Sequence, residues 1–137
     1  MKAILSLFFI VTITLASAQE LDSMSNEYPG VYTLVDEVAT YPGGLTDFYD
    51  FLKSELNYPD QALTKGVEGR VFVQLIVEKN GELTNLQVVK GIGAGCDEEA
   101  MRAIARSSPW NPAKKDGEIV RQILIQNILF KLPKESN

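Results

Sequence analysis

Residues 67–90 read VEGRVFVQLIVEKNGELTNLQVVK, and this segment predicts a β-hairpin. From Val67 to Glu78 apolar residues recur at alternate positions, as they do on the buried face of a strand. The residues on the expected core face are Val67, Val71, Val73, Leu75 and Val77. Asn80-Gly81 is typical of a two-residue turn, because both residues tolerate a positive φ. The chain then returns as a second strand from Leu83 to Lys90.

Two helices are predicted, one on each side of the hairpin in sequence. Leu45 to Leu56 places a row of apolar residues at helical spacing, and Asn57-Tyr58-Pro59 ends that helix because a residue before proline avoids the helical region. The second helix, Asp97 to Ser107, carries small residues on one face and acidic residues in its first turn, which suits the helix dipole. Within it, Glu98 and Arg102 have the spacing of an i,i+4 ion pair.

The last predicted element is a long strand from Ile119 to Leu132. Its apolar residues share one parity in the first half and the other parity in the second half. A strand with one buried face cannot change parity without a bulge, so an irregularity is expected near Gln126-Asn127. Lys114-Lys115, ahead of this strand, reads as a solvated loop. Together the elements predict an α+β fold, in which a small antiparallel sheet of about three strands has helices packed on one face.

The N-terminus has the pattern of a secretory signal peptide. Met1-Lys2 is basic, Ala3 to Leu15 is almost wholly apolar, and Ala16-Ser17-Ala18 supplies the small residues that a signal peptidase reads. Cleavage is expected before Gln19. The alternative is an uncleaved anchor, but the apolar segment is shorter than the roughly 20 residues of a spanning helix. We therefore expect a signal peptide at 1–18, a flexible leader with a possible short strand at 19–40, and the folded domain at 41–133.

The charge of the chain argues against polyanionic partners. Its formal net charge is −5, and an acidic protein repels nucleic acid and anionic lipid. Removal of the first 18 of 137 residues leaves 119. That length suits one domain with a modest core, and no membrane span is expected after cleavage.

No catalytic, cofactor-binding or metal site is predicted, and the protein is not expected to be an enzyme. Histidine is absent, which removes the commonest general base and the commonest metal ligand. The single cysteine, Cys96, cannot form an internal disulfide, and its acidic neighbours oppose a thiolate, so a buried residue is favoured over a nucleophile. The run from Gly91 to Gly95 lacks the lysine and the spacing of phosphate-binding loops.

Seven short segments of the chain form a recognisable series. They are Tyr41-Pro42-Gly43-Gly44, Leu56-Asn57-Tyr58-Pro59-Asp60-Gln61-Ala62, Gly66-Val67-Glu68-Gly69-Arg70-Val71, Asn80-Gly81-Glu82, Cys96-Asp97-Glu98-Glu99-Ala100, Trp110-Asn111-Pro112-Ala113-Lys114-Lys115-Asp116-Gly117 and Ile128-Leu129-Phe130-Lys131-Leu132. In this order and spacing they resemble the TonB C-terminal domain family over residues 41–132.

The resemblance implies a periplasmic protein-binding domain that is linked to transmembrane transport. Domains of this family bind the N-terminal box peptide of TonB-dependent outer-membrane receptors, which adds as a strand to a sheet edge (β-augmentation). An edge strand offers unpaired backbone groups that an extended peptide can satisfy. The resemblance points to Tyr58 and Pro59 in the connector, and to Ile123, Leu124, Ile125, Gln126, Asn127 and Ile128 in the final strand.

The sequence shows no long Pro-rich spacer, so the expected role is a free binding module rather than a complete transducer. Two other functions stay open. A self-associating structural protein of the periplasm would pair its edge strand with a second copy as a homodimer, without receptor binding. An enzyme acting through Cys96 would need an accessible thiol. The run from Val31 to Tyr41 would block peptide addition if it paired with the edge strand.

Overall fold

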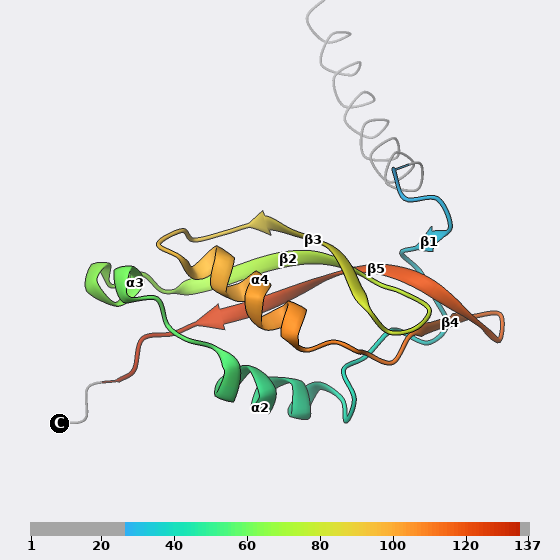
Figure 1. Ribbon diagram of the computed structural model, residues 1–137, viewed down its shortest axis with the longest axis horizontal. Coiled ribbons are helices and arrows are strands. Elements are labelled where there is room, and N and C mark those ends of the chain that lie inside the picture. Colours follow the sequence, from blue (N-terminus) through green and yellow to red (C-terminus); the bar gives the residue numbers. More distant parts are fainter. Residues whose placement is uncertain (1–26, 135–137) are drawn as a thin grey trace, which may run out of the picture. The chain divides into compact units, whose positions relative to one another are not determined.

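The computed structural model of the protein describes residues 27–134. The chain divides into two compact units, Met1–Val31 and Tyr32–Asn137. The expected signal segment, residues 1–18, lies outside the described residues. The described part of the first unit forms a turn, in which the Val31 N–H donates to the Tyr28 carbonyl at 3.1 Å. The second unit contains α2, α3 and α4 and the body of the sheet (Figure 1).

The sheet is larger than the sequence predicts, with five strands in place of about three. Its body consists of β5 (Glu118–Phe130), β2 (Gly69–Val77) and β3 (Leu83–Lys90), in that spatial order and with antiparallel neighbours. The remaining strands are short: β1 (Val31–Tyr32) has two residues and lies within the segment where a short strand was expected, and β4 (Ala113–Lys115) has three residues, too few for a periodic pattern to reveal. β4 pairs antiparallel with the start of β5, so the lysine pair expected in a loop lies in a strand.

The turn between β2 and β3 has three residues rather than the two expected. The Glu78 N–H donates to the Glu82 carbonyl at 2.8 Å, which leaves residues 79–81 in the loop. Gly81 takes a φ of 89°. The Trp110 N–H donates to the Gly81 carbonyl at 2.8 Å, and a Cβ on Gly81 would lie 2.2 Å from the Trp110 carbonyl oxygen. Glycine is therefore required here both by the backbone angle and by the close approach.

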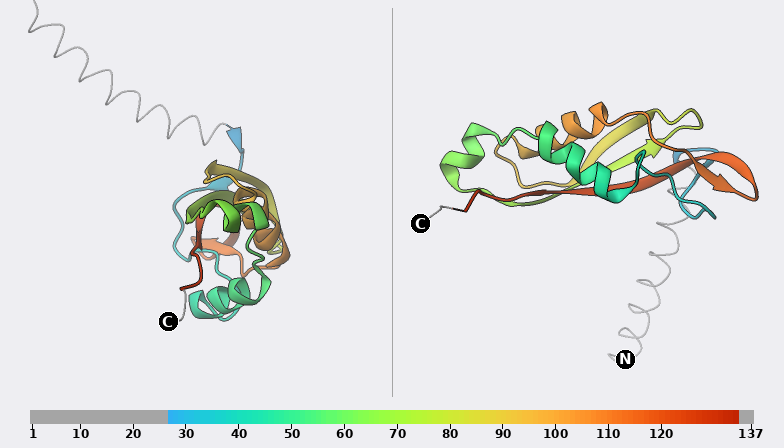
Figure 2. Two further views of the ribbon diagram at one scale, coloured as in Figure 1. Left: turned by 90° about the vertical axis from the view of Figure 1, so that its left-hand side faces the viewer. Right: turned by 90° about the horizontal axis from the view of Figure 1, so that it is seen from below.

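Helices cover one face of the sheet, as predicted (Figure 2). α2 (Leu45–Glu55) and α4 (Cys96–Arg106) are the main ones, and the short α3 (Asp60–Lys65) follows α2. Alternate residues of β2 face the helices and are fully buried, namely Val71, Val73, Leu75 and Val77. The same core contains Phe48, Leu52, Ala62, Ala100, Ala103 and Ile104 from the helices. The small residues of α4 let it contact β2 and β3 closely. The α+β class is confirmed.

β5 runs without the irregularity expected near Gln126-Asn127. Its register against β2 is continuous from Phe130 opposite Gly69 to Gln122 opposite Val77. The apolar parity changes because both faces of the strand carry apolar residues. Those that join the helical core are Val120, Leu124, Ile128 and Phe130, and those of the other parity are Ile119, Ile123, Ile125 and Leu129. The bulge prediction was wrong because it assumed a single apolar face.

The irregularities of the sheet lie between β2 and β3 instead. The register shifts between Phe72 and Val73, and again between Gln74 and Ile76. On β3, Asn85 takes a φ of 50°. Such bulges increase the local twist of a strand pair, and Figure 2 shows this hairpin strongly twisted.

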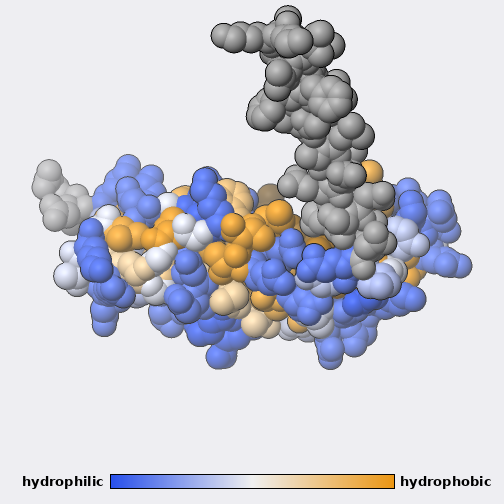
Figure 3. Space-filling view, turned by 90° about the horizontal axis from the view of Figure 1, so that it is seen from above, coloured by the Kyte–Doolittle hydropathy of each residue, from blue (hydrophilic) through white to orange (hydrophobic). Residues whose placement is uncertain are grey.

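The face of the sheet away from the helices is partly apolar and exposed. Ile125 and Leu129 on β5 and Val89 on β3 each expose about half of their surface. Figure 3 shows one side of the molecule, on which hydrophobic surface gathers between polar regions. A strand in this protein therefore cannot be assigned a buried face from its apolar residues alone.

Candidate functional site

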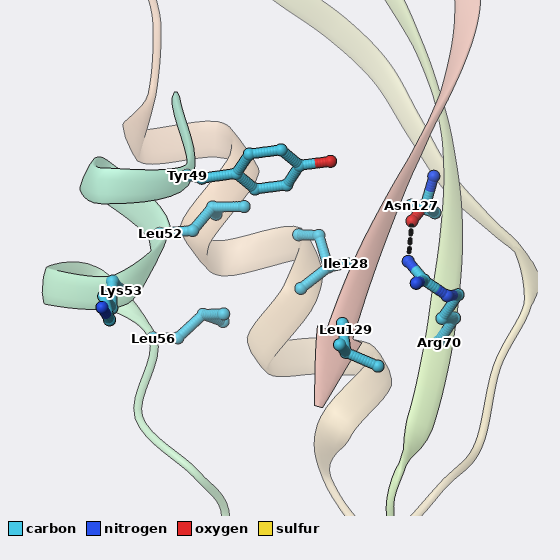
Figure 4. A pocket seen from close by; sticks show the side chains of 8 residues that line it. All are labelled: Tyr49, Leu52, Lys53, Leu56, Arg70, Asn127, Ile128 and Leu129. Carbon is cyan, nitrogen blue, oxygen red and sulfur yellow. Dashed lines mark hydrogen bonds between the residues drawn. The ribbon is translucent and has the colours of Figure 1, made fainter. Parts of the chain in front are cut away.

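A groove of about 300 Å³ lies between α2 and the second half of β5. Its lining residues are Tyr49, Leu52, Lys53 and Leu56 from α2 and its end, Arg70 from β2, and Asn127, Ile128 and Leu129 from β5. In Figure 4, Tyr49, Leu52 and Leu56 project from α2 toward β5, while Arg70 and Asn127 lie on the other side of that strand. The floor is therefore mainly apolar, with polar groups on both sides.

α2 forms one wall of the groove because its buried row stands next to an exposed row. Phe48 and Leu52 are 1% and 5% exposed, and they fix the helix to the core. Tyr49 lies one position further round the helix, is 49% exposed and borders the groove. The helix ends at Glu55, since Leu56 adopts an extended backbone with φ −68° and ψ 126°.

Arg102 fixes the C-terminal end of α2 to α4. Its guanidinium donates to Glu55 Oε1 at 2.8 Å, and to the two carboxylate oxygens of Glu99 at 2.6 and 2.8 Å. The i,i+4 spacing predicted that Arg102 pairs with Glu98, and this prediction was wrong. Arg102 pairs with Glu99 instead, because its guanidinium also reaches Glu55 on α2. Arg102 holds the pKa of the Glu99 carboxyl below its ordinary value, and the Asn57 N–H, which donates to Glu99 at 2.8 Å, adds to this effect.

The outer edge of β5 is incompletely paired. β4 pairs with Glu118, Ile119 and Val120. Among residues 27–134, the strand on the edge away from β2 is β1, which contains two residues against the 13 of β5. The groove opens beside Asn127 to Leu129, at the end away from β4. Backbone groups on such an edge are available to another extended chain.

Residues 33–40 lie against the other end of β5. Their backbone bridges to Asn111 and Lys114, and the Ala39 N–H donates to Gln122 Oε1 at 2.9 Å. The Gln122 side chain in turn donates to the Thr33 carbonyl at 3.5 Å. This segment therefore covers the β4 end of the strand, and within the described residues no backbone bond links it to the edge beside the groove.

Three of the predicted binding residues lie at the open end of β5. Asn127 and Ile128 line the groove, and Gln126 lines an adjacent hollow of about 110 Å³ between the start of α2 and Trp110. Arg70 Nη1 donates to Asn127 Oδ1 at 2.7 Å, which joins β2 to the groove (Figure 4).

The other predicted strand residues are not brought into the groove. Ile123 is 7% exposed and lies opposite the fully buried Ile76. Leu124 packs against the helical core. Ile125 is 55% exposed, but it lies on the face of the sheet away from the helices.

Tyr58 and Pro59 lie in a second hollow, which α4 lines with Glu98, Glu99 and Arg102. The Tyr58 hydroxyl donates to the Val67 carbonyl, and its ring packs edge-on against Phe130 with centroids 5.7 Å apart. Burial raises the pKa of the Tyr58 phenol. The structure therefore uses Tyr58 to hold the end of β5, and it separates this connector from the groove.

Sequence reasoning missed the α2 wall and Arg70. Tyr49 and Lys53 are four positions apart, so a helical projection places them together beside the buried row. The sequence alone could therefore have indicated this wall of the groove. Arg70 carried no such signal, because its place depends on the register between β2 and β5.

Cys96 is unsuited to nucleophilic chemistry. It is fully buried at the start of α4. Burial raises the pKa of its thiol, and the nearby carboxylates of Asp97 and Glu98 raise it further. The thiol therefore stays protonated at neutral pH, the opposite of what a reactive cysteine needs.

Among residues 27–134, no group of three or more His, Cys, Asp or Glu side chains is placed to hold a metal ion. Over the same residues, none of the helices has the length and hydrophobicity needed to cross a membrane.

Comparison with known proteins identifies the family. The family model described as "Gram-negative bacterial TonB protein C-terminal" matches residues 54–132. The solution structure of Helicobacter pylori TonB-CTD (residues 194–285) is 26% identical, with a TM-score of 0.49, and the match covers 66% of this chain and 95% of that one. For Pseudomonas aeruginosa TonB CTD the values are 26%, 0.46, 59% and 82%. A search of curated proteins gave no significant match. Since the family model matches more than half of the chain, the protein belongs to the TonB C-terminal domain family.

Proposed function

We propose that the protein is a periplasmic binding module that engages a TonB-dependent outer-membrane receptor, or another extended peptide, by strand addition to β5. The observation that carries this proposal is the open end of β5 beside an apolar groove. TonB C-terminal domains are protein-interaction domains of the cell envelope that engage TonB-dependent receptors, and they are not enzymes. Family membership therefore supports a role linked to transmembrane transport and argues against catalysis.

The geometry of an added strand fits the surfaces beside this edge. Successive side chains of a strand point to opposite faces of its sheet. One row of peptide side chains would therefore meet the groove wall at Tyr49 and Leu52, and the other row would extend the apolar face that Ile125 and Leu129 begin. Main-chain hydrogen bonds would supply affinity, and these two surfaces would supply selectivity.

Export is part of the proposal. The signal pattern expected at residues 1–18 supports delivery to the periplasm, where the N-terminal segments of outer-membrane receptors are accessible. The module would act there as a partner or regulator of receptor engagement.

A second candidate is self-association through the same edge. Ile125 and Leu129 favour it, because two copies paired along β5 would join their exposed apolar residues into one surface. Sedimentation at several protein concentrations distinguishes this candidate, since a homodimer gains mass with concentration and a receptor-binding monomer does not.

The test is an NMR titration of the protein with synthetic peptides copied from the N-terminal box of TonB-dependent receptors. Strand addition predicts shifts and slowed exchange for the backbone amides of Asn127, Ile128 and Leu129. The matched controls are two versions of the same peptide, one N-methylated at its odd residues and one at its even residues. Only one of the two loses the N–H donors that face β5, so only that version should bind more weakly. Equal binding of both N-methylated sets, or shifts confined to other surfaces, would overturn the proposal.

A further inference from the structure

Residues 33–41, which we call the strap, are joined to β4 and to the residues before it by backbone hydrogen bonds. The Glu37 N–H donates to the Lys114 carbonyl at 3.0 Å, and the Lys114 N–H donates back to the Glu37 carbonyl at 2.9 Å. Thr40 and Asn111 exchange a second pair of bonds, at 3.1 and 2.7 Å. Reciprocal bonds of this kind join antiparallel strands. Figure 1 shows the segment passing beside β4 on its way to α2.

The strap has a further anchor on β5. Ala39 is 4% exposed, and its N–H donates to the side chain of Gln122 at 2.9 Å in the interior. Gln122 is itself 4% exposed and also donates to the Thr33 carbonyl at 3.5 Å. These bonds fix the strap at the end of β5 that lies away from the groove.

The last residue of the strap, Tyr41, contacts the helix that forms the groove wall. The centroid of its ring lies 5.4 Å from that of Phe48 and 5.6 Å from that of Phe51, and both belong to α2. Trp110 completes the cluster, with its ring 5.3 Å from Phe48 and 6.4 Å from Tyr41. Centroids at these separations are typical of favourable aromatic contacts. The strap therefore ends in direct contact with α2.

This contact supports the half of α2 that is otherwise weakly held. The N-cap residue, Gly44, supplies no side-chain hydrogen bond to the first turn. The other end of the helix is fixed by Glu55, which pairs with Arg102 on α4 at 2.8 Å. The buried row of α2 begins at Phe48. The ring of Tyr41 against Phe48 therefore helps to set the position of the first half of the helix.

The groove residues of α2 lie within about one turn of this contact. Tyr49 follows Phe48 directly, and Leu52 and Lys53 come one turn later. A shift of the helix at Phe48 would move these side chains relative to β5, and with them the wall drawn in Figure 4. A series of packed side chains thus leads from the strap to the groove.

We propose that the strap regulates the groove: its attachment beside β4 holds α2 in the position that accepts a peptide, and its release loosens the wall and weakens binding. Tyr41 is a positioning residue, because it contacts α2 and does not line the groove. The inference rests on the proposed strand addition and adds the regulation of that site. Residues 33–53 precede the family match at 54–132, so this device lies outside the matched segment.

Coupling between two sites is reciprocal. If the attached strap strengthens peptide binding, a bound peptide strengthens the attachment of the strap by the same factor. A strap that only stabilised the fold would lower the free energy of unfolding when released, but it would leave the peptide affinity of folded molecules unchanged. Peptide affinity and the hydrogen exchange of strap amides therefore distinguish regulation from simple stabilisation.

The first variant, Glu37→Pro, releases the strap by removing the N–H that donates to Lys114. The Glu37 side chain is 71% exposed, so the core is left intact. With the receptor-box peptide of the titration above as the probe, we expect the dissociation constant to rise about fivefold or more, the lower end of typical couplings. Without peptide, the amides of α2 should exchange faster. Glu37→Gln is the matched control, because it keeps the N–H and should behave as the parent.

The second variant, Tyr41→Leu, tests the contact with α2. It keeps the backbone bonds of the strap but removes the ring that meets Phe48, and it should also weaken binding and speed exchange in α2. Gly93→Ala controls for a general loss of stability, because its φ of 73° is strained for alanine while its Cβ would meet open space. Both readouts should stay at the parent values in that control. In the parent, bound peptide should slow exchange of the Ala39 and Thr40 amides.

The outcomes separate the two proposals. If the peptide binds the parent and both strap variants equally, the regulation is wrong and strand addition stands. Faster exchange in α2 with unchanged affinity also overturns the regulation, because the strap would then only stabilise the helix. Tighter binding after Glu37→Pro would make the strap inhibitory, which contradicts the proposal. If no peptide binds the parent, strand addition fails and the regulation of that site fails with it.

Discussion

Gln122 and Gln126 both lie on the face of β5 that is turned toward the helices, yet their surroundings differ. Gln122 is 4% exposed, and its side chain accepts from the Ala39 N–H and donates to the Thr33 carbonyl. Gln126 is half-buried, donates to the adjacent Asn127 carbonyl at 3.3 Å, and borders a hollow.

The two glutamines represent two ends of one strand. Around Gln122, residues 33–40 lie against β5, so the polar groups of its side chain find partners inside the protein. Around Gln126 the strand borders a hollow at the start of α2, next to the groove where we propose that a peptide binds. The difference teaches that one strand can combine an end that stabilises the fold with an end that we propose binds a peptide, and substitutions can separate the two.

The largest effect is expected for Gly81→Ala, at the turn that docks on the closed end. The Cβ would lie 2.2 Å from the Trp110 carbonyl oxygen, and the φ of 89° is strained for alanine. We expect the free energy of unfolding, measured by urea denaturation, to fall by about 3 kcal/mol. Gly117→Ala is the matched control, because its φ of 78° is similar but its Cβ would meet open space. Equal losses in both variants would show that the contact with Trp110 is unimportant.

The next effect compares the two glutamines directly. Gln122→Ala leaves the buried Ala39 N–H without its acceptor, and we expect a loss of about 2 kcal/mol. Gln126→Ala removes a bond to an adjacent carbonyl, and we expect a change within about 0.5 kcal/mol. Chemical denaturation of both variants measures this. Similar losses would remove the distinction between a closed and an open end.

Acidification should lower the stability of the fold by a smaller amount, and carboxyls near both ends of β5 contribute to this loss. Hydrogen bonds from Arg121 lower the pKa of the Glu78 carboxyl at the closed end, and those from Arg102 lower the pKa of Glu99 behind the groove. A carboxyl with a lowered folded pKa stabilises the fold above its unfolded pKa of about 4.3, and that stability is lost as pH falls through the folded pKa.

Melting temperatures measured from neutral pH down to pH 3 test this expectation. Glu78→Gln and Glu99→Gln should each flatten the acid slope, since the substituted group no longer binds a proton on unfolding. An unchanged slope in both variants would assign the acid sensitivity to other carboxyls.

The smallest effect on stability is expected for Tyr49→Ala in the groove wall. Its side chain is 49% exposed, so the free energy of unfolding should change by less than about 0.5 kcal/mol. Peptide affinity, measured by the NMR titration, should nevertheless decrease because a groove contact is lost. A large loss of stability with unchanged affinity would show that Tyr49 belongs to the core rather than to the binding end.

Local patterns predicted the local parts of this fold. The hairpin from β2 to β3 and helices α2 and α4 follow from apolar periodicity and turn residues over short windows. β4 was missed because three residues are too few for a periodic pattern to show a strand. The bulge in β5 was predicted wrongly, since no local rule tells that Ile123 is buried by Ile76 on the second face of the sheet.

The candidate site was predictable only in part, because some of its residues come together through long-range packing that local patterns do not show. The resemblance pointed to Asn127 and Ile128, and both line the groove. Lys53 and Arg70 come together with them only through the packing of α2 and the register of β2, which are long-range properties. Glu99 in place of Glu98 as the partner of Arg102 is a further example, because the choice depends on Glu55 across the helix interface.

The continuous register between β2 and β5 also sets the order of assembly. β2 and β3 are neighbours in sequence, so their hairpin closes a short loop, whereas Gly69 must find Phe130 and Val77 must find Gln122 across most of the folded segment. Non-local pairing of this kind is slow relative to hairpin and helix formation. Until β5 arrives, β2 presents a bare edge of its own, which is a hazard for aggregation. The β5 edge to which we propose that a peptide adds therefore exists only in chains that have completed the slowest step of folding.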